Sequence, residues 1–430
     1  MSRSSKQRVH VITMGCAKNV VDSEKLMAQL RGNDFELAPT IEDADVAVIN
    51  TCGFIDAAKR ESIDEILEQV GRKKDGGLRK VYAIGCLTER FRTTLAEEIP
   101  EVDGYFGSGA SVQLVEELGG RVRQELLGER VLSTSSHIAY LKVSEGCDHP
   151  CAFCAIPLMR GRLLSRPMEE ILRETEMLAA RGVREVVVIA QDTTAYGLDL
   201  YGSRKLSQLV RKIADVSGIA WVRLMYTYPA QFPLDLLEVI AGHPRVCKYL
   251  DIPVQHVSEA VLRSMRRGIS RRALLSLIER IRSAVPGIAL RSTLIVGYPT
   301  EGSKEFNELL AFIKVVRFDR LGVFTYSREE GTTAHSLGDP VSMREKERRL
   351  AMVMETQQEI STERNEGLVG SKIQVMVDRV EGDQYVGRTE HDAPEIDNEV
   401  YLTADSALVP GQFCEATITG ASEYDLYGRA

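Results

Sequence analysis

The sequence lacks the segments that mark secreted and membrane proteins. Its first 15 residues, MSRSSKQRVHVITMG, contain no apolar core of the kind found in a secretory signal. No run approaches the roughly 18 apolar residues that a membrane span needs, and no solenoid repeat or low-complexity tract is visible. We therefore expect a cytoplasmic protein with no membrane partner. A chain of 430 residues is too long for one hydrophobic core and predicts about three domains.

Several common catalytic motifs are also missing. The seven histidines form no HExxH or other paired-ligand spacing, and no GxSxG nucleophile motif occurs. Residues 297–304 follow the pattern GxxxxGSK, in which the last two residues are reversed relative to the phosphate-binding GxxxxGK loop that continues with Ser or Thr. The sequence therefore gives little support to a metalloprotease, a serine hydrolase or a P-loop enzyme.

Cysteine is where the sequence becomes informative. Eight cysteines in a long chain without a secretory signal do not indicate a disulfide framework. Three of them, Cys147, Cys151 and Cys154, form a compact CxxxCxxC motif with no fourth ligand in an obvious place. A structural zinc site needs four ligands, and His149 would be strained as the fourth because it lies between two of the cysteines in the sequence. An iron–sulfur cluster held by three thiolates would instead leave one iron open for chemistry.

Three further cysteines follow a repeated pattern near the N-terminus. The apolar stretches RVHVITMGC, DVAVINTCG and KVYAIGC run into Cys16, Cys52 and Cys86, and each is followed by a helical pattern. Such alternation predicts a parallel α/β sheet, with ligands beyond the carboxyl ends of its strands. The three thiols should meet at that edge as a second metal centre. The alternative, three separately buried cysteines, does not account for the repeated placement.

The remainder predicts two more units. Six candidate strands alternate with helical patterns and favour an open, partial (βα)6 barrel, with the CxxxCxxC loop on its active face; the strands are expected at 139–144, 185–190, 220–226, 248–254, 289–297 and 320–327. A charged helix over 341–367 is the expected connector, and short alternating strands from residue 370 predict a small β-barrel. The predicted domains are therefore 1–125, 135–365 and 366–430 within an overall α/β fold.

The CxxxCxxC motif, with Phe153 before its last cysteine, resembles the signature of the radical S-adenosylmethionine (SAM) superfamily. That resemblance implies a 4Fe–4S cluster on Cys147, Cys151 and Cys154, whose open iron binds SAM and cleaves it to a 5′-deoxyadenosyl radical. Residues 293–301 resemble the superfamily's adenine-packing strand end through Ile295 and Gly297, although Thr293 replaces a glycine and Glu301 comes one position late. We expect SAM to contact Phe153, Gln255, Ile295 and Gly297; catalytic residues beyond the cluster ligands are not predicted.

The order of all three units is similar to that of the methylthiotransferase family, over nearly the whole chain. The resemblance implies a second, auxiliary 4Fe–4S cluster on Cys16, Cys52 and Cys86. The expected cofactors are therefore two 4Fe–4S clusters and SAM. One SAM would supply the radical and another the methyl group, while the cofactors carry the difficult chemistry. It also implies a low-potential electron donor such as flavodoxin or ferredoxin.

Charge guides the choice of substrate within that family. Residues 366–430 contain 13 acidic and 4 basic side chains, a net charge of −9, so the rest of a chain with charge −8 carries only +1. RNA binding depends on basic residues, and an acidic domain instead attracts a basic protein. The resemblance implies two branches of the family, one of which modifies the aspartate β-carbon of small-subunit ribosomal protein twelve, free or in the ribosome. The charge favours this branch, and we expect binding through an acidic run: Glu390, Asp392, Glu395, Asp397 and Glu399.

Two alternatives stay open from the sequence. The other family branch modifies an adenosine of tRNA and carries a C-terminal module, the TRAM domain, that binds RNA; the acidic tail makes tRNA an unlikely partner. A non-catalytic ribosome-assembly factor with structural clusters is the second alternative. Release of 5′-deoxyadenosine from SAM would distinguish an enzyme from such a factor.

Overall fold

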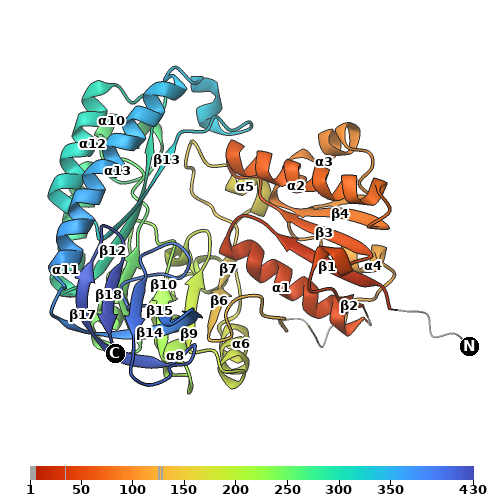
Figure 1. Cartoon of the computed structure of the whole chain (residues 1–430). Coiled ribbons are helices and arrows are strands. Elements are labelled where there is room, and N and C mark those ends of the chain that lie inside the picture. Colours follow the sequence, from red (N-terminus) through yellow and green to blue (C-terminus); the bar gives the residue numbers. More distant parts are fainter. Residues whose placement is uncertain (1–5, 34, 124–125, 127–128) are drawn as a thin grey trace, which may run out of the picture.

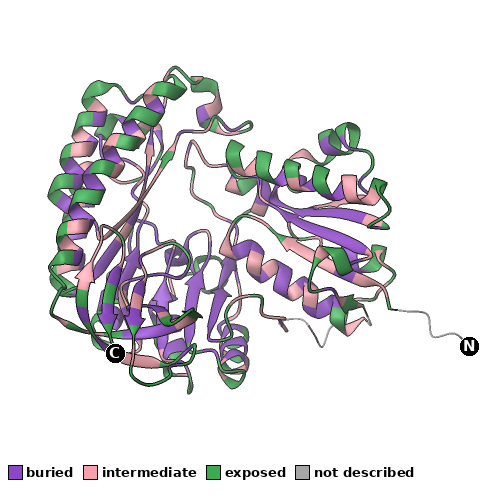
Figure 2. Ribbon diagram, viewed as in Figure 1, coloured by how far each residue is buried: buried purple, intermediate pink, exposed green. Residues whose placement is uncertain are grey.

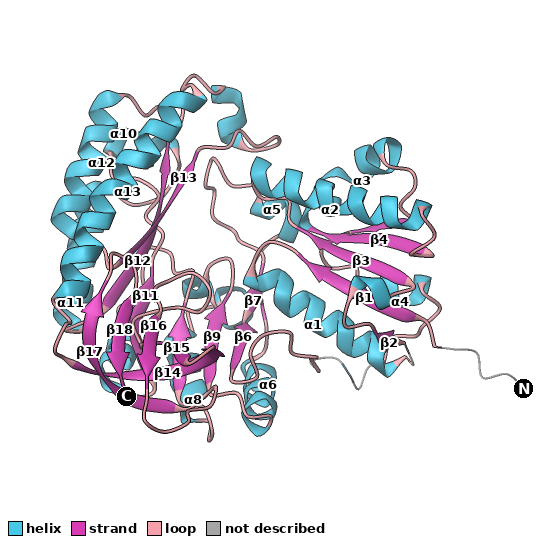
Figure 3. Ribbon diagram, viewed as in Figure 1, coloured by secondary structure: helices cyan, strands magenta, loops and turns pink. Residues whose placement is uncertain are grey.

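The first unit is a parallel sheet with helices on both faces (Figures 1 and 3). The computed structural model describes residues 6–33, 35–123, 126 and 129–430. The five strands are arranged in the order β2-β1-β3-β4-β5: β1 (Arg8–Thr13), β2 (Glu36–Leu37), β3 (Val46–Thr51), β4 (Lys80–Gly85) and β5 (Gly104–Phe106). The helices are α1 (Ala17–Gly32), α2 (Asp56–Lys74), α3 (Cys86–Glu98) and α4 (Ser111–Glu117), with a short turn η1 (Ile41–Asp43).

The central strands of this sheet are apolar because both faces are covered (Figure 2). Every residue of β3 is buried. Val46 and Val48 pack toward α1 and α4, whereas the alternating Ala47 and Ile49 pack toward α2 and α3. This continuous apolar run is typical of a parallel strand buried on two sides.

The second unit is the predicted open barrel. Its six parallel strands are arranged in the order β13-β12-β11-β10-β9-β6, without pairing between the two edges: β6 (Ile138–Lys142), β9 (Glu185–Ile189), β10 (Trp221–Leu224), β11 (Val246–Asp251), β12 (Ala289–Val296) and β13 (Arg320–Thr325). The helices are α6 (Met168–Ala180), α7 (Leu198–Tyr201), α8 (Leu206–Asp215), α9 (Asp235–Gly242), α10 (Glu259–Ser264), α11 (Arg271–Ala284) and α12 (Ser303–Val316), with turns η3 (Thr193–Ala195) and η4 (Thr333–Leu337). The prediction of a six-unit partial barrel is confirmed.

A two-stranded ribbon closes the loop that carries the CxxxCxxC motif. Strand β7 (Ser144–Glu145) pairs antiparallel with β8 (Leu164–Ser165), and the short helix α5 (Ile156–Arg160) lies between them. Helix α5 packs against α3 of the first unit through Met159 and Cys86. The ribbon therefore brings the motif loop of the barrel against the N-terminal sheet.

The connector is the long helix α13 (Met343–Glu366), which begins at Ser342, whose hydroxyl accepts a hydrogen bond from the Glu345 amide. It packs on α12 and β13 and leads to the closed C-terminal barrel, whose strands follow the order β14-β15-β16-β18-β17: β14 (Lys372–Glu381), β15 (Gln384–Arg388), β16 (Val400–Thr403), β17 (Phe413–Ala421) and β18 (Leu426–Arg429). Among the described residues, no helix is both long and apolar enough to cross a membrane.

The C-terminal barrel lies against the inner side of the open barrel, and the two share apolar contacts (Figure 1). Met376 and Ala393 pack with inward-facing side chains of the open barrel, and the ring of Trp221 meets that of Phe413 edge-on at 4.9 Å between centroids. The segment between β15 and β16, residues 389–399, is here called the acidic loop. It contains all five carboxylates of the predicted acidic run.

The predicted role of this acidic run in substrate binding does not suit Asp392 and Asp397, whose side chains are buried. Asp392 pairs with Arg320, and Asp397 pairs with Arg291. The reason is that the open barrel presents inward-facing arginines, which need anionic partners when they are removed from water.

The other three members of the run also have partners inside the chain. Glu390 accepts a hydrogen bond from the Lys248 amide, Glu395 accepts one from the Tyr140 hydroxyl, and Glu399 pairs with Arg379. Glu390 and Glu395 thus help attach the acidic loop to the open barrel, whereas Glu399 pairs within the C-terminal barrel. Because Glu395 is exposed, substrate binding at that end of the run stays a prediction.

Candidate active site

All six cysteines of the two predicted centres line one cavity of about 390 Å³. The cavity lies where the carboxyl ends of the open-barrel strands meet the N-terminal unit, and its thiols are Cys16, Cys52, Cys86, Cys147, Cys151 and Cys154. The sequence places two triads in separate domains; only the tertiary structure brings them to a common space.

The first triad is shaped by three loops that follow parallel strands. Cys16 is the residue before α1, Cys52 follows β3, and Cys86 begins α3. The loops are packed so closely that a Cβ on Gly15, whose φ is +90°, would lie 2.6 Å from the Cβ of Cys52. Glycine is therefore required there both for its backbone conformation and for the space that it leaves.

The second triad is held in a loop with backbone anchors on two sides. The Ala152 amide donates to the Met265 carbonyl at 2.9 Å, and the Ala152 carbonyl accepts from the Ala334 amide at 2.7 Å. At the start of the loop, a Cβ on Gly146 would meet the Arg162 carbonyl oxygen at 2.0 Å. The motif is thus fixed in place by contacts from distant parts of the barrel.

Three of the thiols are buried enough to resist ionisation without a cation. Burial raises the pKa of Cys52 to about 11, that of Cys147 to about 11 and that of Cys154 to about 12. A metal centre bound here would displace these protons, because thiolate is the ligand form.

The geometry of the triads does not suit a single ion. Across the part of the chain that the structure describes, no three His, Cys, Asp or Glu side chains surround one point where a metal ion would sit. A zinc site would bring all its ligands to within about 2.0–2.3 Å of one metal. Sets of three thiols facing a common cavity fit a larger polynuclear group better.

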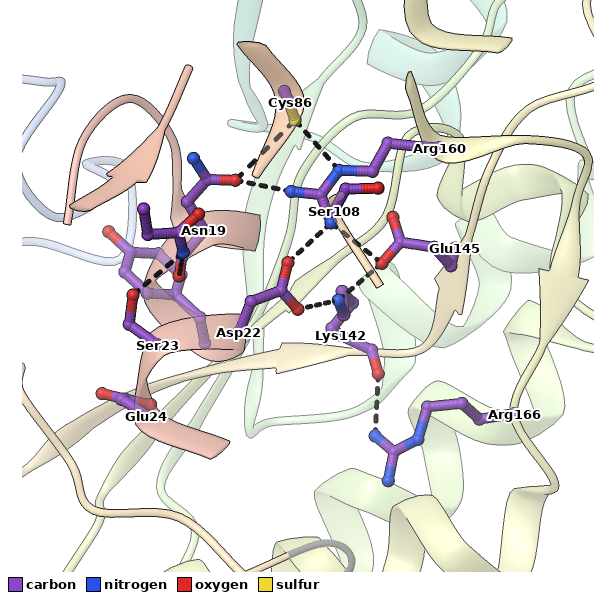
Figure 4. A network of polar contacts seen from close by, with 12 residues as sticks. Asn19, Asp22, Ser23, Glu24, Cys86, Ser108, Lys142, Glu145, Arg160 and Arg166 are labelled. Carbon is purple, nitrogen blue, oxygen red and sulfur yellow. Dashed lines mark hydrogen bonds and ion pairs between the residues drawn. The ribbon is translucent and has the colours of Figure 1, made fainter. Parts of the chain in front are cut away.

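A polar network beside the first triad joins α5 and β7 of the barrel to α1 of the N-terminal unit (Figure 4). Arg160, at the end of α5, donates to the sulfur of Cys86 at 3.1 Å, to Asp22 at 2.6 Å and to the side-chain oxygen of Asn19 at 2.5 Å. Lys142 pairs with both Asp22 and Glu145. Because Asp22 and Glu145 already neutralise Arg160, this arginine fixes the α5–α1 contact instead of offering a free guanidinium to a ligand.

Several polar atoms on the cavity wall are buried without a partner, which is the condition expected of a ligand site. These atoms are the side-chain oxygens of Gln191 and Gln255 and the Nε of Arg267. Leaving a buried polar group unpaired costs about 1–3 kcal/mol. Together with the thiols, they fit a cavity built to hold iron–sulfur clusters and a polar cofactor.

Two of the four residues predicted to contact SAM line this cavity, and two do not. Phe153 and Gln255 are on its wall. Ile295 packs in a neighbouring apolar cluster that also contains Phe153. Gly297, with φ +74°, faces the Lys346 side chain of α13, where an added Cβ would lie 2.3 Å from the lysine Cγ. The strand end is therefore shaped by helix packing, which the sequence motif does not reveal.

Glu301 has a structural role that its displaced position in the motif concealed. It is buried, accepts a hydrogen bond from the Gly297 amide at 3.1 Å and pairs with Arg349 at 2.6 Å. These contacts fasten the end of β12 to α13.

Sequence reasoning missed several cavity residues, among them Lys18, Tyr228 and Arg267. Lys18 lies two positions after Cys16, and burial lowers its pKa to about 8, against the opposing effect of Cys16. Tyr228 stacks on His149 with ring centroids 3.6 Å apart, and His149 contacts Asp192 at 2.6 Å. Arg267 lies over the Tyr228 ring at 4.3 Å. Position after a strand end was the available signal, but it does not distinguish them from other rim residues.

Comparison with known families divides the chain into three matches. Residues 8–107 match the uncharacterized protein family UPF0004, residues 141–313 match the radical SAM superfamily, and residues 369–430 match the TRAM domain. Each match coincides with one structural unit described above.

Curated proteins match over almost the full length. The chain is 51% identical over 429 residues to the ribosomal protein uS12 methylthiotransferase RimO of Chloroherpeton thalassium, covering 99% of each chain. It is 48% identical over 428 residues to the protein of the same name from Cytophaga hutchinsonii, covering 99% of this chain and 98% of the relative. The relative of that name from Porphyromonas gingivalis is 49% identical over 429 residues, with 99% of each covered.

Solved structures share the fold at low identity. The radical SAM methyltransferase TsrM from Kitasatospora setae superposes with a TM-score of 0.56 at 14% identity, covering 76% of this chain and 77% of that one. The cobalamin-dependent radical SAM enzyme OxsB gives 0.51 at 13% identity, covering 82% of this chain and 56% of that one. At these identities the likeness concerns architecture alone.

Proposed function

This chain belongs to the ribosomal protein uS12 methylthiotransferase family, and from that membership we propose that it adds a methylthio group to the β-carbon of an aspartate side chain of uS12. One SAM molecule serves as the radical source and a second as the methyl donor. The observation that carries the proposal is the shared cavity lined by six thiols from two units of the chain.

Within that cavity each triad would hold one 4Fe–4S cluster. Cys147, Cys151 and Cys154 would hold the cluster that binds SAM; the auxiliary cluster would be held by Cys16, Cys52 and Cys86. When bound, these groups supply radical generation, sulfur and methyl transfer. The chain itself supplies a largely apolar enclosure, and Arg160 of the barrel contacts Cys86 of the first triad.

For SAM, the proposal assigns direct contact to Phe153 and Gln255, whose side chains are on the cavity wall. Ile295 acts indirectly, because it packs in the same apolar cluster as Phe153. Gly297 keeps the end of β12 close to α13.

The protein substrate is supported by charge as well as by the relatives. The chain carries a net charge of −8, which favours a basic ribosomal protein over a phosphate backbone. Since the substrate is a ribosomal protein, the proposal places the enzyme in the cytoplasm. Its electron donor would be a low-potential protein such as flavodoxin or ferredoxin.

Mass spectrometry of uS12 and tRNA from cells with and without the gene tests the substrate. We expect the mass increase of a methylthio group on one uS12 aspartate to disappear in the deletion strain and to return with the gene. Loss of a methylthio mark from tRNA, with uS12 unaffected, would assign the protein to the other branch. Absence of any change in both would support a non-catalytic role.

The two-cluster assignment has its own test. Anaerobically reconstituted protein should contain about eight irons per chain, and replacing either cysteine triad by alanine should reduce this to about four. Replacing Cys247 and Cys414, which do not line the cavity, should leave the iron content unchanged. An iron content that is the same in wild type and in a triad variant would contradict the assignment.

A further inference from the structure

Lys18 is a buried cation on the wall of the active cavity. It lies in the first turn of α1, directly beyond Cys16, and only 8% of its surface is exposed. Its Nζ is 2.9 Å from the centre of the Tyr226 ring, which follows β10 of the open barrel. The ammonium group is therefore located between the first triad and the barrel mouth.

Lys18 has no anionic partner among the residues that the structure describes. Its Nζ makes no hydrogen bond or ion pair, whereas Arg160 and His149 on the same wall contact Asp22 and Asp192. Arg267 also has no carboxylate partner, but its Nη atoms donate to the Cys151 sulfur and the Pro253 carbonyl. Its hydrogen bonds are therefore directed at the second triad and its surroundings.

The nearby carboxylates are already used by other groups. Asp251 accepts from the Tyr226 amide at 2.9 Å and from Arg291 at 3.0 Å. Glu145 accepts from Lys142, Arg160 and Gln191. A buried, unpaired ammonium is costly, and a ligand that brings a carboxylate into the cavity would remove that cost.

The position of the ammonium is fixed by a rigid support. Tyr226 has φ 59°, an uncommon conformation for a large residue. The Tyr226 amide donates a hydrogen bond to Asp251, and the Tyr226 carbonyl accepts one from the Thr193 amide at 3.0 Å. The aromatic ring under Lys18 is thereby held still, and an ammonium on an aromatic face keeps its outer N–H groups available.

We propose that Lys18 binds the side-chain carboxylate of the substrate aspartate and so positions its β-carbon beside the first cysteine triad. The inference rests on the proposed function and adds to it a substrate-binding residue. The carboxyl carbon is bonded directly to the β-carbon that is modified, so holding the carboxylate fixes the reacting atom. An uncharged asparagine in the same place would lose this contact.

A double-mutant cycle with the reconstituted, SAM-loaded enzyme tests the proposal. The dissociation constant is measured for uS12 carrying its natural aspartate and for uS12 with asparagine at that position. We expect Lys18→Met to weaken binding of the aspartate form by about 30-fold or more. Asparagine in uS12 should weaken binding to the wild-type enzyme similarly, and the two changes together should cost little more than either one.

Control variants separate this role from a structural one. Lys18→Arg retains a cation and should keep the preference for aspartate over asparagine, while Arg162→Met, at a side chain that is 90% exposed, should leave it unchanged. The iron content of Lys18→Met should equal that of wild type. If Lys18→Met loses its iron, Lys18→Arg still decides the matter: equal binding of both uS12 forms to it would overturn the proposal.

The result also distinguishes failure of the inference from failure of the proposed function. If wild-type enzyme modifies uS12 and Lys18→Met retains the wild-type preference for aspartate, Lys18 is not the carboxylate partner. If wild-type enzyme neither binds nor modifies uS12, the substrate assignment fails, and this inference fails with it.

Discussion

Arg160 connects two parts of the chain that are far apart in sequence. Its side chain is 5% exposed and contacts Asp22 and Asn19 of α1, Glu145 of β7 and the sulfur of Cys86. Burial of Arg160 opposes its charge, but the half-buried carboxylates of Asp22 and Glu145 raise the pKa of Arg160 above its ordinary value. Arg160 therefore influences the site in two ways: it contacts the Cys86 sulfur, and it holds α5 of the barrel against α1 of the N-terminal unit.

Replacing Arg160 by leucine should destabilise the protein by about 3–5 kcal/mol, because Asp22 and Glu145 would lose a buried partner and retain only Lys142. Urea unfolding of the cluster-free protein measures the change. The matched control is Arg162→Leu, two positions along, which is 90% exposed and should change the stability by about 0.5 kcal/mol or less. Equal stabilities for the two variants would contradict the importance of the Arg160 network.

Gly15→Ala should prevent the first triad from holding a cluster while sparing the second. The added Cβ would meet the Cβ and sulfur of Cys52 at 2.6 and 2.9 Å. We expect reconstituted protein to contain about half the wild-type iron. Gly76→Ala is a matched control, because Gly76 also has positive φ (+83°) but nothing lies within 4 Å of its added Cβ. Full iron content in both variants would contradict this expectation.

At the scale of elements, the acidic loop joins the C-terminal barrel to the interior of the open barrel. Arg223 is completely buried; it pairs with Glu185 and donates to the Glu390 carbonyl at 2.7 Å. Arg388 pairs with Glu185 and Asp378, and Arg320 with Asp392. Ion pairs thus cross the contact in both directions, since Asp392 of the loop neutralises Arg320 of the open barrel and Glu185 of the open barrel neutralises Arg388 of β15.

Asp392→Ala should weaken this attachment by about 3–5 kcal/mol, since Arg320 would remain as an unpaired, largely buried cation. The single tryptophan, Trp221, packs against Phe413 of the C-terminal barrel, so its fluorescence reports the attachment directly. Asp405→Ala breaks an exposed pair with Arg429 and should have an effect of less than about 1 kcal/mol. A tryptophan signal that responds equally to both substitutions would contradict the role of the acidic loop.

Acid should detach the same element. Burial opposes ionisation, but neighbouring arginines lower the pKa of Glu185 and Asp392, and a hydrogen bond with His137 together with Arg388 lowers that of Asp378, below the usual values near 4. A carboxyl with a lowered folded-state pKa stabilises the fold fully above its ordinary pKa, and this contribution is lost as pH falls through the folded value. Asp397 contributes to the pH dependence of stability with the opposite sign, because burial raises its pKa.

The three lowered groups outnumber the one that is raised, so we expect Trp221 fluorescence to change below about pH 4. Asp392→Ala, which lacks one of the three, should show a smaller pH-dependent loss of stability over that range. A wild-type signal that is constant down to about pH 2 would show that these ion pairs do not hold the barrel in place.

For the whole molecule, activity requires that two separately folded units share one cavity. Glu329, in the loop after β13, is 2% exposed and pairs with Lys59 of α2 at 3.1 Å and with Arg90 of α3 at 2.8 Å. Ser327 of the same loop accepts a hydrogen bond from the Asp56 amide at 3.3 Å. This contact joins the far edge of the open barrel to the N-terminal unit.

Glu329→Ala should loosen that junction without removing any cysteine. We expect the iron content to remain at the wild-type level, while methylthiolation of uS12 falls by about tenfold or more because the triads no longer hold a fixed separation. Quantitative mass spectrometry of uS12 measures the loss. The adjacent Glu330→Ala is the control, because Glu330 is exposed and only its carbonyl contacts Arg90. Comparable methylthiolation by the two variants would contradict the importance of the junction.

Much of this architecture could be predicted from sequence because its signals are local. The apolar strand before Cys52, the six βα repeats and the alternating strands after residue 370 all appear in the structure. Local patterns gave the wrong prediction where the burial of a side chain depends on a partner far away in the sequence. Asp392 and Asp397 belong to a run typical of a solvated loop, but they are buried against Arg320 and Arg291.

The sequence by itself determined where the two cysteine triads lie along the chain and the fold of each unit, because ligand spacing and hydrophobic periodicity are properties of neighbouring residues. Only the tertiary structure decided that both triads face one cavity, that the acidic loop fills the open barrel, and that Lys18 lies unpaired beside Cys16. Those outcomes depend on groups that meet although more than a hundred residues separate them in sequence, such as Arg160 with Asp22 and Arg223 with the Glu390 carbonyl. Their pairing follows from packing, which a pattern along one chain does not specify.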